Sequence, residues 1–212
     1  EFGHNYTSRT TGNFMKKYRY YQPKTLAEAF LIRQTHPDAR IVAGGTDLLV
    51  RIRKGELRPN AVLSLRSVSE LSGIEVGDRT RIGALSTISE ILAHAELGDR
   101  FPILRSAVQR MASVQIRNVA TIGGNLCNCS PCADTATPLM VLDARVRLAS
   151  PKGTREIHLH DFFQGPGSSC LLRDEIMTDI LLTTPEPTVK TAFYKKGRVH
   201  MDLALASMSV LL

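Results

Sequence analysis

The sequence predicts an α+β protein made of two subdomains that meet near residue 70. Residues 40–65 follow the order strand, glycine pair, helix, strand, which is typical of a βαβ unit. Beyond them the pattern changes to short hairpins and helices. The chain has 212 residues, of which 43% are hydrophobic, so it can bury a core of its own. We therefore expect one subdomain at 15–70 and a second at 71–190.

The N-terminal subdomain is expected to open with a helix. Thr25 and Glu28 have the spacing of a capping box, in which side chains accept hydrogen bonds from the free backbone N–H groups at a helix start. Apolar residues then recur at helical spacing until Pro37, which cannot continue a helix. The other elements expected here are a strand at 40–43, a helical turn at 48–53 and a strand at 61–65.

The second subdomain is expected to mix hairpins with short helices. Residues Thr87 to Glu90 cap one helix, and Pro102 stands where another begins, followed by a clear apolar stripe. The remaining elements expected here are hairpins at 73–83 and 145–159, a helix at 138–142 and a strand at 176–182.

Charge and hydropathy argue against two classes of partner. Lys and Arg outnumber Asp and Glu by 27 to 20, but the basic runs are short and only 6% of residues are aromatic, so we expect no nucleic-acid binding. No apolar run reaches the length of a membrane span and no signal-peptide core follows a basic start, which predicts a cytoplasmic protein that binds no membrane. The basic surplus suits an anionic cofactor or an acidic partner, and equally an ordinary solvated surface.

Both ends of the chain carry sequence that does not fit a complete protein. Residues 1–14 are polar and aperiodic, whereas Met15 resembles a natural start, so we interpret 1–14 as a leader added by cloning. At the other end, an apolar strand pattern continues to Leu212, and no polar residues follow it. We interpret 191–212 as the start of a truncated C-terminal subdomain.

The first motif is the glycine pair Gly44-Gly45, which lies between the strand at 40–43 and the helical turn at 48–53. Backbone N–H groups at 44–47 can converge there on a phosphate. The pattern is neither the dinucleotide fingerprint G-x-G-x-x-G nor a Walker loop, which needs Gly-Lys-Ser/Thr. Taken by itself, a glycine pair after a strand is more often a tight turn.

The second motif is the stretch 118–134, which holds a glycine pair, hydroxyl and amide side chains, three Cys and one carboxylate within seventeen residues. Such a density of small and hydrogen-bonding residues predicts a loop whose backbone approaches a polar ligand closely. Together the two motifs predict a large, phosphate-bearing ligand gripped from both sides. Asp134, at the end of the stretch, can bind ribose hydroxyls or cap the following helix, and the sequence leaves both roles open.

No metal site and no catalytic constellation is assigned from the residues. The three Cys between 127 and 132 have the spacing C-x-C-x-x-C, which fits neither a zinc site nor a ferredoxin, and Cys170 would have to arrive as a fourth ligand. We favour thiols that pack beside a ligand. His158 and His160 lie on one face of a predicted strand, with no carboxylate or third His spaced to join them. A Ser/His/Asp arrangement and a carboxylate pair are also missing.

Taken together, the two motifs resemble the FAD-binding subunit of molybdenum hydroxylases, a family that includes the carbon monoxide dehydrogenase medium subunit and the xanthine dehydrogenase flavin domain. The residues that carry the resemblance are 42–48, 115–126 and Ser130-Pro131-x-x-Asp134, and it extends over 16–212. It implies a PCMH-type FAD-binding fold, similar to vanillyl-alcohol oxidase. In that fold two α/β subdomains clasp FAD, and a small C-terminal subdomain, truncated here, lies behind them.

The resemblance also implies which residues bind the cofactor. The first motif would bind the pyrophosphate through the backbone N–H groups of Ala43, Gly44, Gly45, Thr46, Asp47 and Leu48. Thr121, Gly124 and Asn125 would lie on the other side of the pyrophosphate, and Asp134 would bind the adenosine ribose. The walls around FAD would include Met111, Ala112, Cys127 and Met177.

The function that the resemblance implies is electron transfer. A molybdopterin-binding large subunit would hydroxylate the substrate, a small subunit with 2Fe–2S clusters would carry the electrons, and the FAD here would pass them to NAD⁺ or another acceptor. This relay needs no acid or base side chain, in agreement with the missing constellation. Cys129 and Cys132 stand where the family more often has small residues. They keep open the alternative of a metal- or iron–sulfur-binding module that uses Cys127, Cys129 and Cys132; a standalone flavin reductase is a further alternative.

Overall fold

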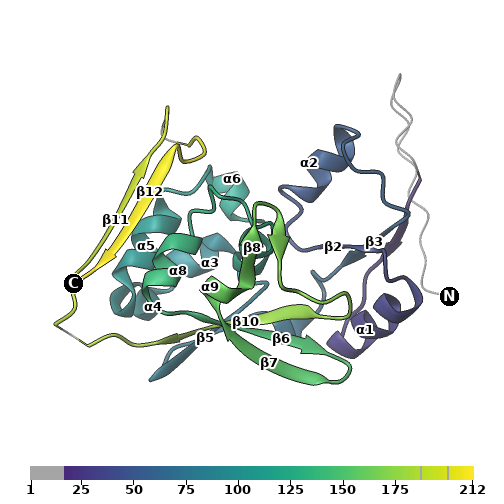
Figure 1. Ribbon diagram of the computed structural model, residues 1–212, viewed down its shortest axis with the longest axis horizontal. Coiled ribbons are helices and arrows are strands. Elements are labelled where there is room, and N and C mark those ends of the chain that lie inside the picture. Colours follow the sequence, from purple (N-terminus) through teal and green to yellow (C-terminus); the bar gives the residue numbers. More distant parts are fainter. Residues whose placement is uncertain (1–16, 187, 200) are drawn as a thin grey trace.

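The computed structural model describes residues 17–186, 188–199 and 201–212. It shows a small and a large sheet, with a hairpin at the far end of the molecule from the small sheet (Figure 1). The leader expected at 1–14 lies outside the described residues. No helix in the described part of the chain is long and apolar enough to cross a membrane.

The small sheet is parallel and has the strand order β1-β3-β2. Strand β2 (Arg40–Val42) pairs with β3 (Ala61–Ser64), and helix α2 (Leu48–Arg53) connects them. This arrangement confirms the βαβ unit expected from the sequence. Strand β1 (Arg19–Tyr21) was not expected, because its Arg-Tyr-Tyr sequence has neither apolar alternation nor β-branched residues.

Helix α1 (Leu26–Thr35) packs against the small sheet and buries Ala29 completely. It begins where the capping signal predicted, since the side chain of Thr25 accepts a hydrogen bond from the Glu28 N–H at 3.2 Å. The second half of the capping box is shifted by one residue. The Glu28 carboxylate accepts from the N–H of Lys24, at 2.8 Å, instead of that of Thr25.

The large sheet is antiparallel, with the order β4-β5-β10-β6-β7. Its central strand is buried at seven of eight positions, because helices cover one face and paired charged side chains cover part of the other. The strands are β4 (Ile74–Glu75), β5 (Arg79–Gly83), β6 (Arg145–Ser150), β7 (Gly153–His158) and β10 (Ile176–Thr183). Both expected hairpins and the expected strand at 176–182 are therefore present.

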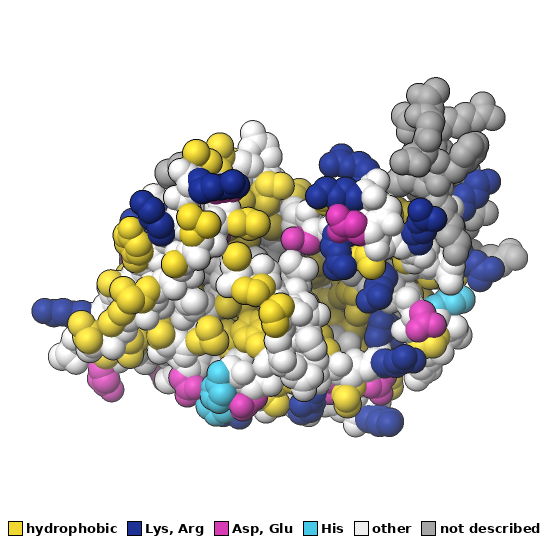
Figure 2. Space-filling view, turned by 45° about the horizontal axis from the view of Figure 1, so that its top comes forward, with side chains coloured by type: hydrophobic (Ala, Val, Ile, Leu, Met, Phe, Trp, Pro, Cys, Tyr) yellow, Lys and Arg dark blue, Asp and Glu magenta, His cyan; other side chains and the backbone are white. Residues whose placement is uncertain are grey.

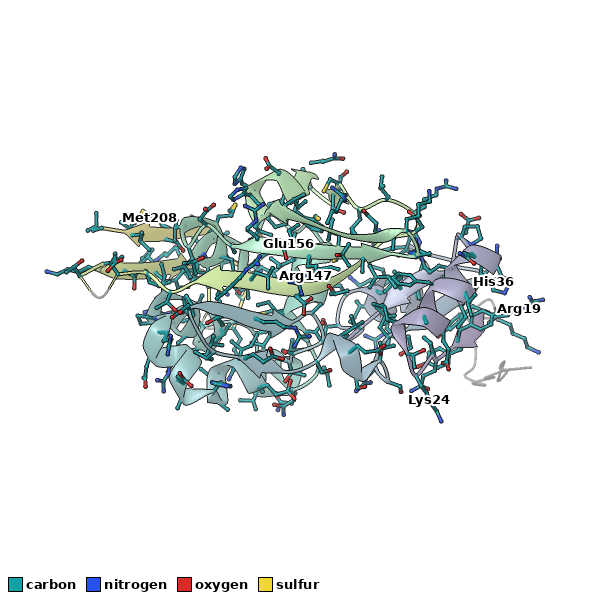
Figure 3. The ribbon with its side chains drawn as sticks, turned by 90° about the horizontal axis from the view of Figure 1, so that it is seen from below. Arg19, Lys24, His36, Arg147, Glu156 and Met208 are labelled. Atoms are coloured by element: carbon teal, nitrogen blue, oxygen red, sulfur yellow. The ribbon has the colours of Figure 1, made fainter. Side chains whose placement is uncertain are left out.

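Charged side chains pair with one another on the face of the large sheet opposite the helices. Figure 3 shows Arg147 and Glu156 close together on neighbouring strands, and Arg147 Nη2 lies 2.9 Å from Glu156 Oε1. The same guanidinium reaches Asp179 Oδ2 at 3.2 Å through Nη1. Asp179 is only 3% exposed, so its charge is compensated within this cluster.

Short helices pack on the inner face of the large sheet and bury the aromatic side chains of Phe101 and Phe162. The helices are α3 (Ile88–Ala93), α4 (Ala95–Arg100), α5 (Pro102–Gln109), α6 (Val114–Arg117), α7 (Ile122–Cys127), α8 (Ala136–Val141) and α9 (Leu159–Phe162), with a 3₁₀ turn at Ser69–Leu71. Thr87 and Glu90 form a complete capping box at the start of α3. Pro102 occupies the first turn of α5, as expected.

The second glycine motif is not the open loop that its composition suggested. Gly123 and Gly124 lie inside α7, because Thr121 caps this helix by accepting a hydrogen bond from the Gly124 N–H at 3.1 Å. The glycines are tolerated in the first turn of a helix whose start is fixed by such a cap. The motif therefore presents a short helix to its surroundings.

The C-terminal hairpin is made of β11 (Thr191–Lys196) and β12 (Ala206–Leu211), and it packs on α5 and α8 (Figure 1). A strand was expected at the end of the chain, but β11 was not. The remaining strands, β8 (Phe163–Gly165) and β9 (Ser168–Ser169), form a small hairpin of their own. The subdomain boundaries near 70 and 190 stay a prediction.

Candidate functional site

A cavity of about 380 Å³ lies between the small sheet and the helices of the large one. Its walls come from β2 and α2 on one side, from α7 on the other, and from the first residues of β10. Figure 2 shows this part of the surface hollowed, with Lys and Arg side chains gathered on one side of the hollow and hydrophobic side chains on the other. The volume is within the range of ligand pockets, about 300–1,000 Å³.

The first motif contributes backbone donors to this cavity. Strand β2 ends at Val42 and helix α2 begins at Leu48, so five residues cross the cavity wall in an irregular conformation. None of the N–H groups from Gly44 to Leu48 has a hydrogen-bond acceptor among the described residues. Unpaired backbone donors that cluster at a cavity wall attract an anion.

The glycines of the first motif also have a structural role. A Cβ on Gly44 would lie 2.0 Å from the carbonyl oxygen of Val119, which belongs to the other motif. Gly45 has a left-handed φ of 79°, and a Cβ there would lie 2.7 Å from Leu49 Cδ1. Glycine at 44 lets the two motifs come together, and glycine at 45 allows the turn into α2. A valine at Gly45 would therefore disturb folding as well as binding, so it cannot isolate a phosphate role.

The second motif contributes side chains rather than backbone donors. The N–H groups of Ile122 and Gly123 are already bonded to the carbonyl oxygens of Ser86 and Ala84, at 3.0 and 2.9 Å. The amide of Asn128 instead reaches across the cavity wall and donates to Asp47 Oδ1 at 3.2 Å. One hydrogen bond thus joins the two motifs, which are 81 residues apart in the chain.

The structure brings most of the predicted site residues to this one cavity. Those on its wall are Ala43, Gly44, Gly45, Thr46, Asp47, Leu48, Met111, Thr121, Gly124, Asn125, Cys127 and Met177. Lining residues that were not among the predicted site residues include Arg33, Arg40, Arg51, Asn128 and Glu175. No sequence signal links Arg33, a single arginine within α1, to a ligand. The roles assigned to individual residues stay predictions.

Asp134 does not line the cavity. Its carboxylate is buried and lies 2.8 Å from Lys195 Nζ, which is itself buried and also donates to the carbonyl oxygen of Arg110 at 3.3 Å. Burial raises the pKa of Asp134, and the hydrogen bond from Lys195 opposes that shift. No capping hydrogen bond to α8 is present either, since the residue at the cap position is Thr135, whose side chain makes none. The ribose role therefore stays a prediction, without support from the placement of Asp134.

Ala112, the other predicted residue away from the cavity wall, has a positive φ of 43°. Arg117 Nη1 donates to the carbonyl oxygen of Ala112 at 2.9 Å and to that of Met111 at 2.7 Å. Arg117 thus holds the turn between α5 and α6 in shape. That turn positions Met111 on the cavity wall.

The cysteines are free thiols. Cys127 is exposed at the cavity wall, and the protein atoms around its sulfur raise the pKa of the thiol to about 12. Burial raises the pKa of Cys129 as well, against a hydrogen bond from Ser169 that lowers it. Among the described residues the cysteines do not gather into a three-ligand group, so the metal-module alternative gains no geometric support.

His158 has the carboxylate neighbour that sequence spacing did not find. Its Nδ1 lies 2.8 Å from Asp143 Oδ1, its Nε2 lies 3.0 Å from Arg145 Nη1, and its ring stacks on His160 at 5.2 Å. An arginine can only donate, so Nε2 accepts and Nδ1 donates to Asp143. Both ring nitrogens therefore have a hydrogen-bond partner. A metal ion at Nδ1 would place the ring proton on Nε2, where two donors, this N–H and the Arg145 guanidinium, would face each other.

Comparison with known proteins decides what kind of site this is. Residues 16–185 match the family described as the FAD binding domain in molybdopterin dehydrogenase. The chain belongs to this family. It is 39% identical over 190 residues to the nicotinate dehydrogenase FAD-subunit of Eubacterium barkeri, covering 87% of this chain and 64% of the relative. It is 36% identical over 189 residues to the xanthine dehydrogenase FAD-binding subunit of Escherichia coli O157:H7, covering 87% of this chain and 65% of the relative.

A solved member of the same family has the same architecture. Carbon monoxide dehydrogenase from Hydrogenophaga pseudoflava superposes with a TM-score of 0.88 at 29% identity, covering 92% of this chain and 68% of that chain. The α+β, PCMH-type FAD-binding fold and the cofactor FAD are thereby confirmed at the level of the family. The chain spans a little under two thirds of the length of the first two relatives.

Proposed function

We propose that this chain is the FAD-binding, electron-transferring component of a molybdopterin-dependent hydroxylase or dehydrogenase. The observation that supports this most directly is the set of unpaired N–H groups from Gly44 to Leu48 on the cavity wall. Buried or half-buried donors without acceptors are costly, and a pyrophosphate would supply acceptors along that wall. The family match gives the dinucleotide its identity as FAD.

The rest of the cavity suits the remainder of this cofactor. Met111 and Met177 offer polarizable, apolar side chains for a flat ring system, and Thr121 and Asn125 offer polar groups from the wall opposite the first motif. When bound, FAD supplies both one-electron and two-electron chemistry that protein side chains lack. The chain's own residues would bind and orient it, and the Asn128–Asp47 hydrogen bond bridges the two motifs that would hold it.

The names of the relatives support a multi-subunit complex. They are named as FAD subunits or medium chains of dehydrogenases, and such names imply further subunits. A molybdopterin-binding large subunit and a 2Fe–2S small subunit are therefore proposed as partners, and NAD⁺ as one terminal acceptor. A cytoplasmic location is proposed on the same basis.

The experiment that tests the proposal is reconstitution of the purified chain with FAD, FMN or riboflavin, followed by gel filtration and identification of the retained chromophore. We expect FAD to be retained close to one per chain, with bands in the blue and near ultraviolet. A folded protein that retains no FAD would contradict the proposal. Steady oxidation of NADH by the isolated chain would favour the standalone reductase instead.

A further inference from the structure

The net charge of the chain is concentrated in the part of the structure that contains the small sheet. Residues 17–66, which form this sheet with α1 and α2, hold 10 Lys and Arg against 4 Asp and Glu, a net charge of +6. Residues 67–212 hold 15 of each and are neutral. The basic surplus therefore lies on one side of the cavity, where Figure 2 shows Lys and Arg side chains gathered.

The densest group of these cations lies on α2 and the turn that follows it. Backbone N–H groups of Glu56 and Leu57 donate to the carbonyl oxygen of Arg51, at 3.0 and 3.3 Å, and fold the turn back on the helix. Four exposed cations and one leucine, 44% exposed, thereby share a small area that we call the α2 basic surface. Its residues are Leu49, Arg51, Arg53, Lys54 and Arg58.

Within the chain this surface has little acidic compensation. Glu56 lies 3.8 Å from Arg51 Nε and 4.0 Å from Lys54 Nζ, and half of its side chain is exposed, so these pairs contribute little. Arg53 and Arg58 form no ion pair with a described residue. The end of a helix favours cations in its last turn, which accounts for Arg51 and Arg53 but not for Arg58. A ligand in the cavity does not account for Arg58 either, since this residue does not line it.

The charge of the α2 basic surface indicates the kind of partner that it fits. A second copy of the chain offers no match, because residues 67–212 are neutral and acidic side chains such as Glu156, Glu175 and Asp179 are already paired. A permanent subunit is also a poor match, since permanent interfaces are more apolar and interface cores contain few Lys. Exposed cations around one leucine are typical of a small interface that forms and separates quickly, as between electron-transfer proteins.

We propose that the α2 basic surface is the docking site of an acidic electron-carrier protein, which binds reversibly beside the cavity. The inference rests on the proposed function, because an electron-transferring flavoprotein needs an acceptor, and this surface reaches the cavity wall through Arg51. A one-electron carrier takes one electron in each encounter. Two carriers are therefore reduced for each FADH₂ oxidised to FAD, and both protons pass to solvent.

The test measures the association rate of the FAD-loaded chain with an acidic 2Fe–2S ferredoxin by surface plasmon resonance, between about 0.02 and 1 M salt. The triple variant Arg53→Glu, Lys54→Glu, Arg58→Glu should slow association by about ten- to a hundredfold at low salt. The corresponding Gln variant should have a smaller effect in the same direction. At about 1 M salt, where the Debye length is about 3 Å, all proteins should associate at similar rates.

The matched control changes the net charge by the same amount elsewhere. Lys152→Glu, Arg173→Glu, Lys190→Glu reverses three exposed cations of the neutral part that have no ion pair among the described residues, and it should retain most of the wild-type rate. Equal losses in both triple variants would mean that only net charge matters, and would overturn the proposal. So would a wild type that binds basic cytochrome c as well as the ferredoxin, or one that binds duplex DNA or phosphatidylserine vesicles but no ferredoxin.

The outcomes are separable from those of the proposed function. Arg53, Lys54 and Arg58 do not line the cavity, so FAD retention and the melting temperature of the variants report whether fold and cofactor site are intact. A wild type that retains FAD but does not bind the ferredoxin overturns the docking site alone. A wild type that binds the ferredoxin through this surface but retains no FAD overturns the proposed function instead.

Discussion

Glu175 connects the stability of the fold to pH through a single ion pair. Its side chain is 5% exposed, and Arg155 holds it with two hydrogen bonds, of 2.6 Å from Nε to Oε1 and 2.9 Å from Nη2 to Oε2. The hydrogen bonds from Arg155 hold the pKa of Glu175 below its ordinary value, against the effect of burial. As the pH falls below about 5, the unfolded chain takes up a proton at this position before the folded one does. The contribution of Glu175 to stability is therefore present near neutral pH and is lost as the pH falls through the pKa of the folded state.

We predict that Glu175→Gln reduces the loss of stability at acid pH. Urea unfolding of the wild type between pH 7 and 3.5 should show stability falling below about pH 5. The variant should be less stable at pH 7 and lose less over the same range. Glu75→Gln serves as the control, because that side chain is 74% exposed and its pair with Arg81 is a surface pair. If the free energy of unfolding fell equally with pH in the wild type and in Glu175→Gln, this ion pair would not cause the loss of stability at acid pH.

The pair of Asp134 and Lys195 allows a second residue-scale prediction. Both side chains are nearly inaccessible, at 7% and 5%, so Lys195→Met leaves a buried carboxylate without its partner. We expect a loss of about 3 kcal/mol in the free energy of unfolding. The double variant with Asp134→Leu should recover much of this loss. Chemical denaturation measures both.

A further variant, Asp134→Asn, distinguishes ribose binding by Asp134 from its pairing with Lys195. If its carboxylate holds the ribose, Asp134→Asn should weaken FAD binding more than it lowers stability. From the geometry we expect the reverse, because the carboxylate is bonded to Lys195 and lies off the cavity wall.

At the scale of elements, a side-chain hydrogen bond connects the cap residues of α2 and α7. Asn128 donates to Asp47 at 3.2 Å and so bridges the two motifs at the cavity wall. We predict that Asn128→Ala weakens FAD binding by up to about tenfold, since one such bond contributes about 0.5–1.5 kcal/mol. Fluorescence titration of FAD measures the effect. Ser89→Ala is a suitable control, because it removes a similar bond, to Asn118, that is not at the cavity. Equal effects of both variants would contradict a bridging role.

The elements predicted correctly from the sequence are those with a local signal. Helix α3 has its capping box and α5 its proline, and both signals act within one turn of the chain. Helix α7 was interpreted as a loop, because glycines at 123 and 124 disfavour a helix unless a cap and tertiary contacts hold them. Strand β11 was not expected, and only the tertiary structure shows that the Lys195 side chain is buried against Asp134.

The site was predictable to the extent that it is built from contiguous motifs. Gly44 and Thr121 belong to such motifs, and both lie on the cavity wall. Arg33 could not be linked to them, because a single arginine on a helix carries no signal, and only the packing of α1 on β2 brings it to the cavity. Asp134 shows the opposite case: it lies in a recognisable motif, but a residue 61 positions later takes its carboxylate.

At the scale of the whole molecule, the cavity lies where the two sheets meet. Ile176, the first residue of β10, belongs to the same hydrophobic cluster as Ala39 and Leu65 beside the small sheet, so the sheets already share part of their core. A ligand that contacts both walls stabilises this junction, by about 2.7 kcal/mol at a hundredfold excess over its Kd. We therefore predict that FAD raises the melting temperature more than ADP or FMN does at equal concentration, because contacts with both walls lower its Kd.

Hydrogen exchange with the same ligands tests how the dinucleotide lies across the junction. ADP should slow exchange of the backbone N–H groups at 44–48, which lack acceptors in the protein, and leave the turn at Met111 unchanged. FAD should protect 44–48 and also reduce exchange near Met111 and Met177, because the flavin is expected between those side chains. FMN should act on the second region more than on the first. If ADP protected the region around Met111 instead, the dinucleotide would lie in the opposite direction across the cavity, and Met111 and Met177 would not contact the flavin.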